Sequence, residues 1–207
     1  MLVRMSVEKT EHRWFAWFYD RMVGAMERGP LGKLRSRLLA ELTGDVLEIG
    51  AGTGSNFRHY GSEARVIAFE PDPHMLKRAR EHVTANIDAR QAPAERLPVD
   101  DASFDVVVST LVLCTVRDVA ASLAEIRRVL RPGGKLVFIE HVRGGGVLGR
   151  AQDTVQPVYG WFAAGCQANR DTEQALRDAG FAFESIEHTQ LSPITPAIYG
   201  VAAVETP

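Results

Sequence analysis

Apolar residues recur at helical spacing in the first part of the chain. Residues 11–42 contain two such segments, and Gly29-Pro30 separates them because this dipeptide breaks a helix. The apolar positions of the two segments are Trp14, Phe15, Phe18, Met22 and Met26, then Leu31, Leu34, Leu38 and Leu39. We therefore expect an N-terminal helical cap over residues 1–42.

After residue 42 the pattern changes to short apolar runs that alternate with helical segments. The predicted strands are Asp45–Gly50, Arg65–Glu70, Ile87–Gln91, Ser103–Thr110 and Lys135–Glu140. The predicted helices are Pro73–Thr84 and Val119–Leu130. Alternation of this kind is typical of a mostly parallel sheet with helices on both faces. The fold class is therefore α/β, doubly wound and Rossmann-like.

The last part of the chain interrupts this alternation and then resumes it. Residues 144–168 fit neither pattern, and they precede a predicted helix at Asp171–Ala179 and predicted strands at Phe181–His188 and Ile198–Val204. These two strands bring the predicted sheet to seven. We interpret residues 1–207 as one domain, made of the cap (1–42), a cofactor-binding core (43–143), a substrate-side insertion (144–170) and a C-terminal helix with strands (171–207).

Composition narrows the class of protein. The chain is 24% charged and 45% hydrophobic, with a formal net charge of -2, so it lacks the basic surface that nucleic-acid binding needs. Its two cysteines form no CxxC pair, which indicates neither a metal site nor a disulfide framework. No apolar run approaches the ~18 residues of a membrane span, and the first ten residues lack a signal-peptide pattern. We therefore expect a cytoplasmic protein without a transmembrane segment.

A glycine-rich loop follows the first predicted strand. Gly50, Gly52 and Gly54 give the spacing G-x-G-x-G, which differs from the G-x-G-x-x-G of dinucleotide sites. Glu48 precedes the loop, and a carboxylate there favours a cationic ligand over a pyrophosphate. S-adenosylmethionine, which carries a sulfonium and an amino group, fits this site. The alternative is a tight turn between strand and helix that binds nothing.

The next two loops supply candidates for the rest of such a cofactor. Glu70 ends the second strand, where a carboxylate can accept hydrogen bonds from ribose hydroxyls. Met75 lies one turn into the following helix and is placed to pack on adenine, although core packing explains it equally well. The backbone of residues 92–95 is expected to face adenine, and Asp105 is expected to be structural. An isolated Glu at the end of a strand is often only solvated, and that alternative stays open for Glu70.

Together these motifs resemble the class I S-adenosylmethionine-dependent methyltransferases. The resemblance rests on Val46–Gly54, Phe69-Glu70-Pro71, Glu95–Pro98, Ser103–Val107 and Arg128–Gly134. The Arg-Pro-Gly-Gly turn is typical of the branch that methylates small molecules, the methyltransferase type 11 domain. The resemblance implies S-adenosylmethionine as cofactor, bound by Glu48, Gly50, Ala51, Gly52, Gly54, Asn56, Phe57, Glu70, Pro71, Met75, Ala92, Ala94, Glu95, Thr110 and Leu111. Pro93 stands where the family has an Asp that binds the adenine amino group, so adenine would rely on backbone groups here.

A closer resemblance covers nearly the whole chain. It is to the methyltransferase-like group that contains alkyl-thiol S-methyltransferases, and it rests on Ser109–Val116, Glu140-His141-Val142, Gly165-Cys166, Asn169-Arg170 and Ile198-Tyr199-Gly200. Residues 19–22 are also similar to quinone-biosynthesis methyltransferases. The vertebrate thiol enzymes carry an N-terminal hydrophobic anchor, for which this sequence shows no segment. Its aromatic first helix is expected to cap the active site, and contact with a membrane surface is the alternative.

Methyl transfer from a sulfonium is an in-line displacement, so the protein mainly positions the acceptor and excludes water. His141 follows the fifth strand and is the candidate catalytic base or polar substrate contact, against the alternative of a structural histidine. Candidate acceptor-binding residues are Trp14, Tyr19, Tyr159, Trp161 and Arg170. The alternative for these residues is core packing or, for Arg170, a cap or ion pair. Cys114 is interpreted as core or pocket wall, and no metal is expected.

The sequence thus predicts a methyltransferase that acts on a small hydrophobic acceptor, with a thiol as the first candidate. Residues 14–22 and 144–168 would form an apolar lid over the acceptor. The alternatives are a quinone, phenol or lipid-like acceptor, and a domain that binds the cofactor without turnover.

Overall fold

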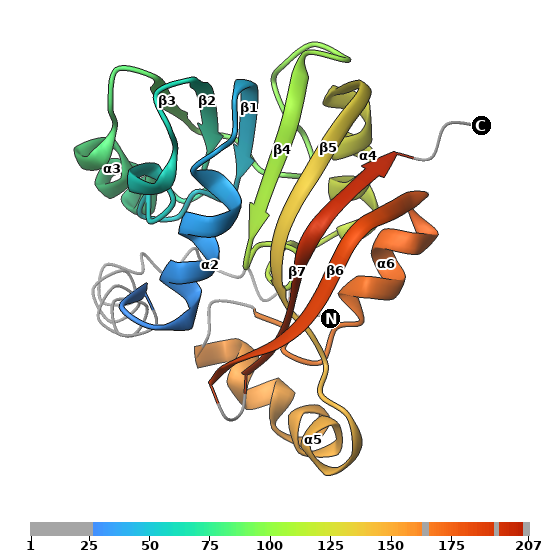
Figure 1. The fold of residues 1–207 in the computed structure, drawn as a ribbon. Coiled ribbons are helices and arrows are strands. Elements are labelled where there is room, and N and C mark those ends of the chain that lie inside the picture. Colours follow the sequence, from blue (N-terminus) through green and yellow to red (C-terminus); the bar gives the residue numbers. More distant parts are fainter. Residues whose placement is uncertain (1–26, 163–165, 193–194, 205–207) are drawn as a thin grey trace, which may run out of the picture.

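A computed structural model describes residues 27–162, 166–192 and 195–204. In this part of the chain seven strands form one sheet in the order β3-β2-β1-β4-β5-β7-β6 (Figure 1). The strands are β1 (Gly44–Ile49), β2 (Ala64–Phe69), β3 (Ile87–Arg90), β4 (Phe104–Thr110), β5 (Leu130–His141), β6 (Phe181–Ser192) and β7 (Thr195–Val204). The predicted seven-stranded, doubly wound sheet is thereby confirmed.

The first five strands are parallel, and the last two are not. β1 pairs in parallel with β2 on one side and β4 on the other, β2 with β3, and β4 with β5. β7 runs antiparallel between β5 and β6. The strand order reverses between β1 and β4, and in open α/β sheets ligands bind beyond the carboxyl ends of the strands at such a point. We therefore expect a ligand site at the loops after β1, β2, β4 and β5.

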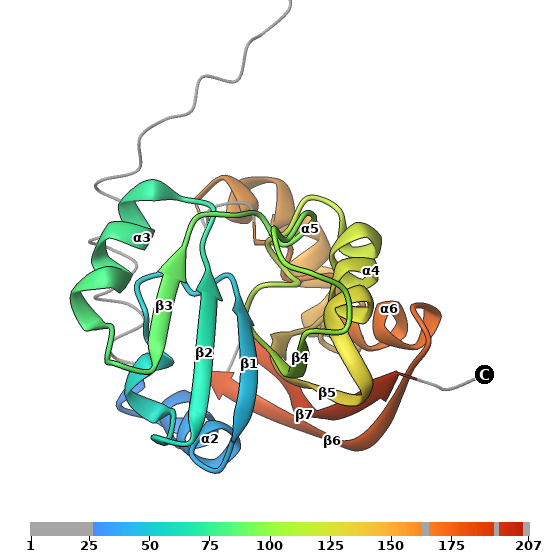
Figure 2. The same ribbon diagram turned by 90° about the horizontal axis from the view of Figure 1, so that it is seen from above.

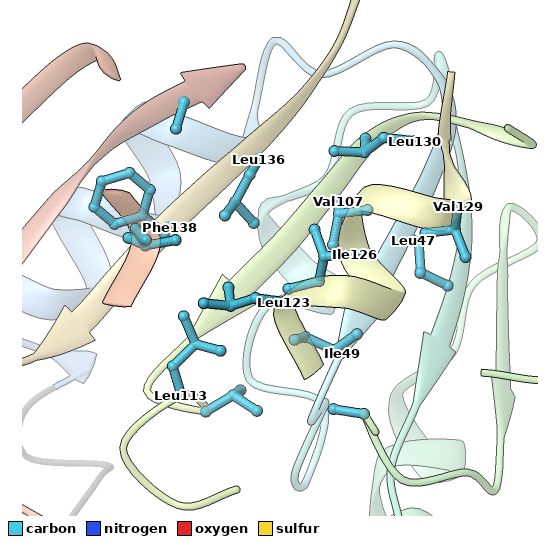
Figure 3. Close-up of a cluster of buried hydrophobic side chains, with 14 of the residues drawn as sticks. Leu47, Ile49, Val107, Leu113, Leu123, Ile126, Val129, Leu130, Leu136 and Phe138 are labelled. Carbon is cyan, nitrogen blue, oxygen red and sulfur yellow. The ribbon is translucent and has the colours of Figure 1, made fainter. Parts of the chain in front are cut away.

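Helices cover both faces of the sheet (Figure 2). Their bounds are α2 (Pro30–Leu39), α3 (Pro73–Ala79), α4 (Val119–Val129), α5 (Gly146–Phe162) and α6 (Thr172–Asp178). Leu39 of α2 and Leu76 of α3 pack with Val46 on one face. On the other face Ile126 of α4 and Leu176 of α6 join the larger core (Figure 3). Neighbouring residues of a central strand, such as Val46 and Leu47, therefore pack into cores on opposite faces of the sheet, as expected of strands buried on both faces.

Three aspartates fix where helices begin. The carboxylate of Asp72 accepts hydrogen bonds from the backbone N–H groups of His74 and Met75 at the start of α3. Asp118 and Asp171 cap α4 and α6 in the same way. Capping satisfies N–H groups that have no partner inside the helix. The predicted starts of these helices therefore lie within one residue of the observed ones.

Some predicted boundaries were wrong. The helix predicted over 73–84 ends at Ala79 and continues as a 3-10 turn over Arg80–His82. β5, β6 and β7 are all longer than predicted. The largest difference is α5, a helix of 17 residues in the segment that fitted no pattern. Figure 1 shows α5 beyond the end of the sheet at which β4 terminates.

Most of the predicted N-terminal cap, including Trp14 and Tyr19, lies outside the described residues. Within the described part, the cap contributes α2, whose Leu31 and Leu39 are buried. None of the helices described is long and apolar enough to cross a membrane.

Candidate active site

The glycine loop leaves β1 at the point where the strand order reverses. Gly50, Gly52 and Gly54 all have positive φ angles, of 57°, 58° and 83°. A Cβ atom at Gly50 would lie 2.6 Å from the Val112 side chain, and one at Gly54 would lie 2.9 Å from the Phe57 ring. At Gly52 an added Cβ would meet nothing within 4 Å. Two of the glycines therefore allow close packing, whereas Gly52 borders open space in which a ligand can approach the main chain.

Glu70 connects the loop after β2 to this glycine loop. One carboxylate oxygen accepts a hydrogen bond from the Gly52 N–H at 2.8 Å, and the other accepts one from the Asp72 N–H at 2.9 Å. The side chain is buried, and burial raises the pKa of its carboxyl group above the ordinary value. An ionised carboxylate has about four acceptor positions, so two remain after these bonds. Pro71 beside it is exposed, and Met75 is half-buried.

Glu48 lies in a closed polar network under the loop. Its carboxylate accepts hydrogen bonds from Asn56 Nδ2 at 3.0 Å and from the Tyr60 hydroxyl at 2.7 Å. Asn56 also donates to Thr110 Oγ1 at 3.2 Å and accepts a hydrogen bond from Arg35 of α2. Burial raises the pKa of Glu48 to about 7, although these donors and the Arg35 charge oppose the shift. The buried side chains of Glu48, Asn56 and Thr110 are thus brought together from three different elements.

Arg35 ties this network to a buried ion pair. Its Nε lies 2.8 Å from a carboxylate oxygen of Glu27, and both side chains are 6% exposed. Arg58 lies 2.9 Å from the other Glu27 oxygen. A buried charge needs a partner, so this pairing holds α2 against the turn that follows the glycine loop. Sequence analysis did not single out Arg35 or Tyr60, since neither lies in a motif.

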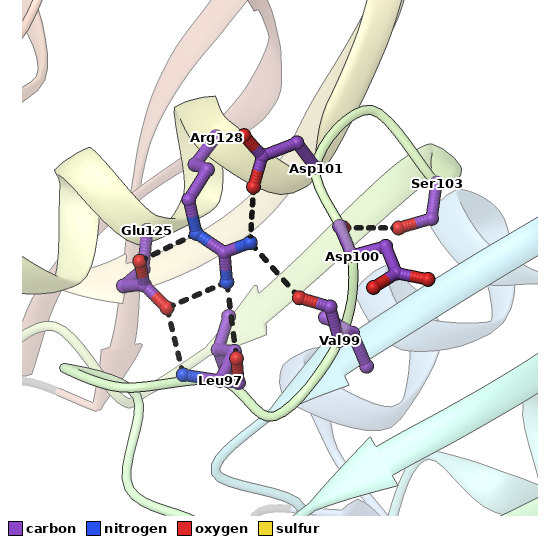
Figure 4. A network of polar contacts seen from close by, with 7 residues as sticks. All are labelled: Leu97, Val99, Asp100, Asp101, Ser103, Glu125 and Arg128. Carbon is purple, nitrogen blue, oxygen red and sulfur yellow. Dashed lines mark hydrogen bonds and ion pairs between the residues drawn. The ribbon is translucent and has the colours of Figure 1, made fainter.

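The loop between β3 and β4 is braced from α4 (Figure 4). Arg128 donates to the carbonyl oxygens of Leu97 at 3.0 Å and Val99 at 2.9 Å, and pairs with Glu125 and Asp101. Glu125 in turn accepts a hydrogen bond from the Leu97 N–H at 2.7 Å. This brace holds the segment that carries Ala92, Ala94 and Glu95. Ala92 and Ala94 are buried.

Glu95 and Asp105 both bond to the main chain. Glu95 Oε1 accepts hydrogen bonds from the Arg117 and Asp118 N–H groups, which ties the β3–β4 loop to the β4–α4 loop. Asp105 accepts one from the Asp45 N–H at 2.8 Å and pairs with Arg131, in keeping with the structural role expected of it.

A third buried acid of the site organises the loop after β4. Glu140 Oε1 accepts hydrogen bonds from Ser109 Oγ at 2.6 Å and from the Val112 N–H at 3.2 Å, and burial raises the pKa of this carboxyl group to about 7. Leu111 just before this loop has a φ of 58°, an uncommon conformation for a side chain of this size. The chain therefore turns sharply at Leu111, so that the following amides face Glu140.

His141 ends β5 beside this loop and is 5% exposed. Its Nδ1 lies 3.9 Å from the Sγ atom of Cys166. Its Nε2 is buried and has no hydrogen-bond partner among the described residues. Buried polar atoms are seldom left without a partner. A free imidazole nitrogen at the carboxyl edge of the sheet is therefore the observation that most favours a ligand on this side.

The remaining predicted acceptor residues divide into two groups. Arg170 donates to the Leu113 carbonyl and, at 3.2 Å, to the Val116 carbonyl, so its guanidinium holds the β4–α4 loop. This contact is structural, although it is neither the cap nor the ion pair named as the alternative for Arg170, and acceptor binding by Arg170 stays a prediction. Tyr159 and Trp161 fall in α5, and their side chains lie outside what the structure describes, as do Trp14 and Tyr19 entirely. Cys114 is buried, in accord with its interpretation as core or pocket wall, and it lies in the turn after β4.

Sequence analysis also missed Glu140 as a site residue. The signal was present: a carboxylate closes the apolar run Leu136–Ile139, where a charged group must find partners to be buried. The pairing of Cys166 with Cys114 and His141 joins residues 25 or more positions apart, and no local pattern indicates it. Among the described residues no group of three potential metal ligands is found.

Rossmann-like sheets bind nucleotide cofactors at a glycine loop where the strand order reverses, with an acid at the end of the next strand. This chain has both features. Residues 47–138 match the family described as "Methyltransferase domain". The chain belongs to the class I S-adenosylmethionine-dependent methyltransferases, and it is a methyl-transferring enzyme. This family implies S-adenosylmethionine as the cofactor.

Relatives of stated activity cover most of the chain. It is 33% identical to human thiol S-methyltransferase TMT1A over 92% of this chain and 86% of that protein. It is 37% identical to human thiol S-methyltransferase TMT1B over 76% and 69% of the two chains. Among solved structures, an S-adenosylmethionine-dependent methyltransferase from Mesorhizobium loti superposes with a TM-score of 0.64 at 25% identity, covering 88% of this chain and all of that one.

Proposed function

We propose that S-adenosylmethionine binds across the carboxyl ends of β1, β2 and β4, and that its methyl group passes to the sulfur of a small hydrophobic thiol. The open backbone at Gly52 and the two unused acceptor positions of Glu70 fit a ribose with two hydroxyls. Glu48, buried beneath the same loop, would supply negative charge once the cofactor is bound, because a cationic sulfonium and amino group nearby favour the ionised form of its carboxyl group. When bound, the cofactor supplies an electrophilic methyl group, and this chain's residues only position it.

The adenine would lie against the braced β3–β4 loop. Ala92 and Ala94 bring small side chains to this loop, and Pro93 between them offers no carboxylate for the adenine amino group. The backbone of residues 92–95 and the half-buried Met75 would then make the contacts. Thr110 and Leu111 would border the cofactor from β4, and Ala51, Asn56 and Phe57 would support the glycine loop from beneath.

The acceptor would approach over β5, and one observation carries this assignment. The buried Nε2 of His141 lacks a partner among the described residues at the edge where the cofactor loops converge. Neighbouring strands lie about 4.8 Å apart, so β5 is two strands, or roughly 10 Å, from β1. A base there faces an acceptor placed beside the methyl group. The thiol itself is inferred from the two human thiol S-methyltransferases, the relatives of highest identity described above.

His141 would take the proton of the acceptor thiol. A free thiol has a pKa of about 8.5 and is mostly protonated near neutral pH, so a base increases the fraction of the reactive thiolate. Nε2 would accept the proton, and the acceptor sulfur would bond to the methyl carbon as the bond from that carbon to the sulfonium breaks and S-adenosylhomocysteine leaves. The buried surroundings of His141 exclude water that would otherwise compete for the methyl group.

A quinone or phenol is the competing acceptor, and a phenolic hydroxyl needs the same base. Binding of the cofactor without turnover is the second alternative. The cytoplasmic location stays a prediction from the sequence, as does an acceptor lid built from residues 14–22 and 144–168. In the described part of that lid, α5 exposes Val147 and Val155.

The test is turnover over a panel of acceptors, read as formation of S-adenosylhomocysteine. The panel holds a hydrophobic alkyl thiol, a hydrophilic thiol, a hydroquinone and a phenol. We expect product with the alkyl thiol and much less with the others. Product from the hydroquinone alone would contradict the thiol assignment and keep the methyltransferase. Cofactor binding by calorimetry without product from any acceptor would contradict the proposed function.

A further inference from the structure

Two cysteines and a histidine meet beside the proposed acceptor position. Cys114 lies in the turn after β4, Cys166 precedes α6 and His141 ends β5. The thiols of Cys114 and Cys166 interact, and the interaction raises the pKa of Cys114 and lowers that of Cys166. On its other side, Cys166 Sγ lies 3.9 Å from His141 Nδ1. Both cysteines are free thiols, and they are the only cysteines in the sequence.

The two thiols differ in exposure and acidity. Cys114 is fully buried, and its hydrogen bond to Cys166 together with burial raises its pKa well above the ordinary value. Cys166 is partly exposed. The hydrogen bond from Cys114, and then the proximity of His141 and Arg170, lower its pKa to about 5. A thiol that is accessible and ionised reacts first with oxidants, whereas a buried neighbour can only react afterwards with its product.

The backbone holds the two cysteines in place. The Gln167 N–H donates to the Cys114 carbonyl at 2.7 Å, so the residue next to Cys166 is bonded directly to Cys114. Gln156 of α5 donates to the Cys166 carbonyl at 2.8 Å and accepts from the Ala168 N–H at 2.9 Å. These bonds keep the main chains of the two cysteines side by side, as a disulfide between them requires.

We propose that Cys114 and Cys166 form a reversible disulfide when the protein meets a peroxide, and that this bond switches off methyl transfer. The Cys166 thiolate attacks one oxygen of hydrogen peroxide, which breaks the O–O bond and leaves a sulfenic acid and hydroxide. The sulfur of Cys114 then attacks the sulfenic sulfur of Cys166. The S–O bond breaks, and the departing hydroxide takes the Cys114 proton to give water. Overall, two thiols and one peroxide give one disulfide and two waters, and a dithiol reductant reverses the change.

Loss of activity would follow from the position of the new bond. The disulfide would tie the β4–α4 loop to the segment before α6 and remove the ionised sulfur that faces His141 Nδ1. Both changes alter the base proposed for the acceptor, so this part of the inference rests on the proposed function. Such a switch suits an enzyme that acts on thiols. The oxidant that forms the Cys114–Cys166 disulfide also converts the free thiols that would be acceptors to disulfides.

The experiment uses the full chain treated with hydrogen peroxide and then with dithiothreitol. Thiol titration should fall from two per chain to none and return to two, and peptide mapping should find residues 114 and 166 linked with the loss of two hydrogens. In Cys114→Ser, oxidation should stop at a sulfenic acid that dimedone traps on Cys166. In Cys166→Ser, the buried Cys114 should react at least about tenfold more slowly than Cys166 does in the wild type, since it is both inaccessible and protonated.

Several results would overturn the inference. Oxidised wild-type protein that keeps two thiols, accumulates sulfinic acid or forms linked dimers would exclude the internal disulfide. A mapped disulfide in a protein that still turns over at the reduced rate would exclude the switch. If the reduced protein methylates no acceptor, the proposed function fails, while the mass measurement on unmutated protein still decides whether the disulfide forms.

Discussion

The Gly52 N–H donates a hydrogen bond of 2.8 Å to the carboxylate of Glu70, which links the loop after β1 to the end of β2. The same carboxylate accepts from the Asp72 N–H. Glu70 thus fixes the shape of the glycine loop and keeps two acceptor positions for a ribose. We therefore expect Glu70 to contribute to cofactor binding directly, through hydrogen bonds from the ribose, and indirectly, by fixing the glycine loop.

Glu70→Ala should weaken S-adenosylmethionine binding at least about tenfold, because hydrogen bonds to a charged group contribute about 1.5–3 kcal/mol each. Calorimetric titration of the variant and the wild type measures this. Glu63→Ala is a matched control, since Glu63 is exposed and lies before the same strand. An unchanged dissociation constant in Glu70→Ala would assign the ribose to another residue.

Gly52→Ala separates backbone strain from ligand contact. Gly52 and Gly133 both have positive φ angles, and both border open space. Alanine in this conformation costs roughly 1–2 kcal/mol, so both variants should lose similar stability in urea unfolding. Only Gly52→Ala places a methyl group where the cofactor is proposed to lie, so only this variant should lose affinity, by about tenfold or more. Equal affinities in the two variants would contradict the proposed position of the cofactor.

Glu48 predicts a dependence of stability on pH. Burial raises its pKa from 4.5 to about 7, with Tyr60, Arg35 and Asn56 opposing the shift and the charge of Glu70 adding to it. The folded chain therefore holds a proton that the unfolded chain releases between about pH 4.5 and pH 7. The free energy of unfolding should fall as pH rises through this window, by on the order of 3 kcal/mol for a shift of this size.

Urea unfolding at several pH values from about 5 to 8 tests this, with Glu48→Gln as the comparison. The amide keeps the shape and cannot ionise, so the decline in stability should be shallower in the variant. It should not vanish, because the pKa of Glu140 is also raised to about 7. Parallel curves for the two proteins would mean that Glu48 does not titrate in this range.

The sequence predicted the central sheet well for a physical reason. Runs such as Val106-Val107-Val108 are buried on both faces, and strands of this kind stand out as unbroken apolar segments. The helices capped by Asp72, Asp118 and Asp171 begin within one residue of their predicted starts, and capping is a local interaction. These features need only neighbouring residues, so a sequence alone can reveal them.

The features that the sequence did not predict depend on long-range contacts, or they form despite residues of low helix propensity. The segment that forms α5 contains Gly146, Gly149, Pro157 and Gly160, and both residue types disfavour a helix interior. The residues to which the sequence assigned no role in the site, such as Arg35 and Glu140, gained their partners only through folding. Arg35 reaches Asn56 across 21 positions, and Glu140 reaches Ser109 across 31.

The last prediction concerns His141, and it separates a catalytic base from a structural histidine. His141→Gln should leave S-adenosylmethionine affinity unchanged and lower kcat for a thiol acceptor at least about tenfold near neutral pH, within the range of general-base effects. The deficit should shrink as pH approaches the thiol pKa of about 8.5, because the acceptor then ionises without help. His82→Gln is the control, since His82 is exposed on the turn after α3. A deficit that stays constant across the pH profile would indicate that His141 supports the fold of the site and takes no proton.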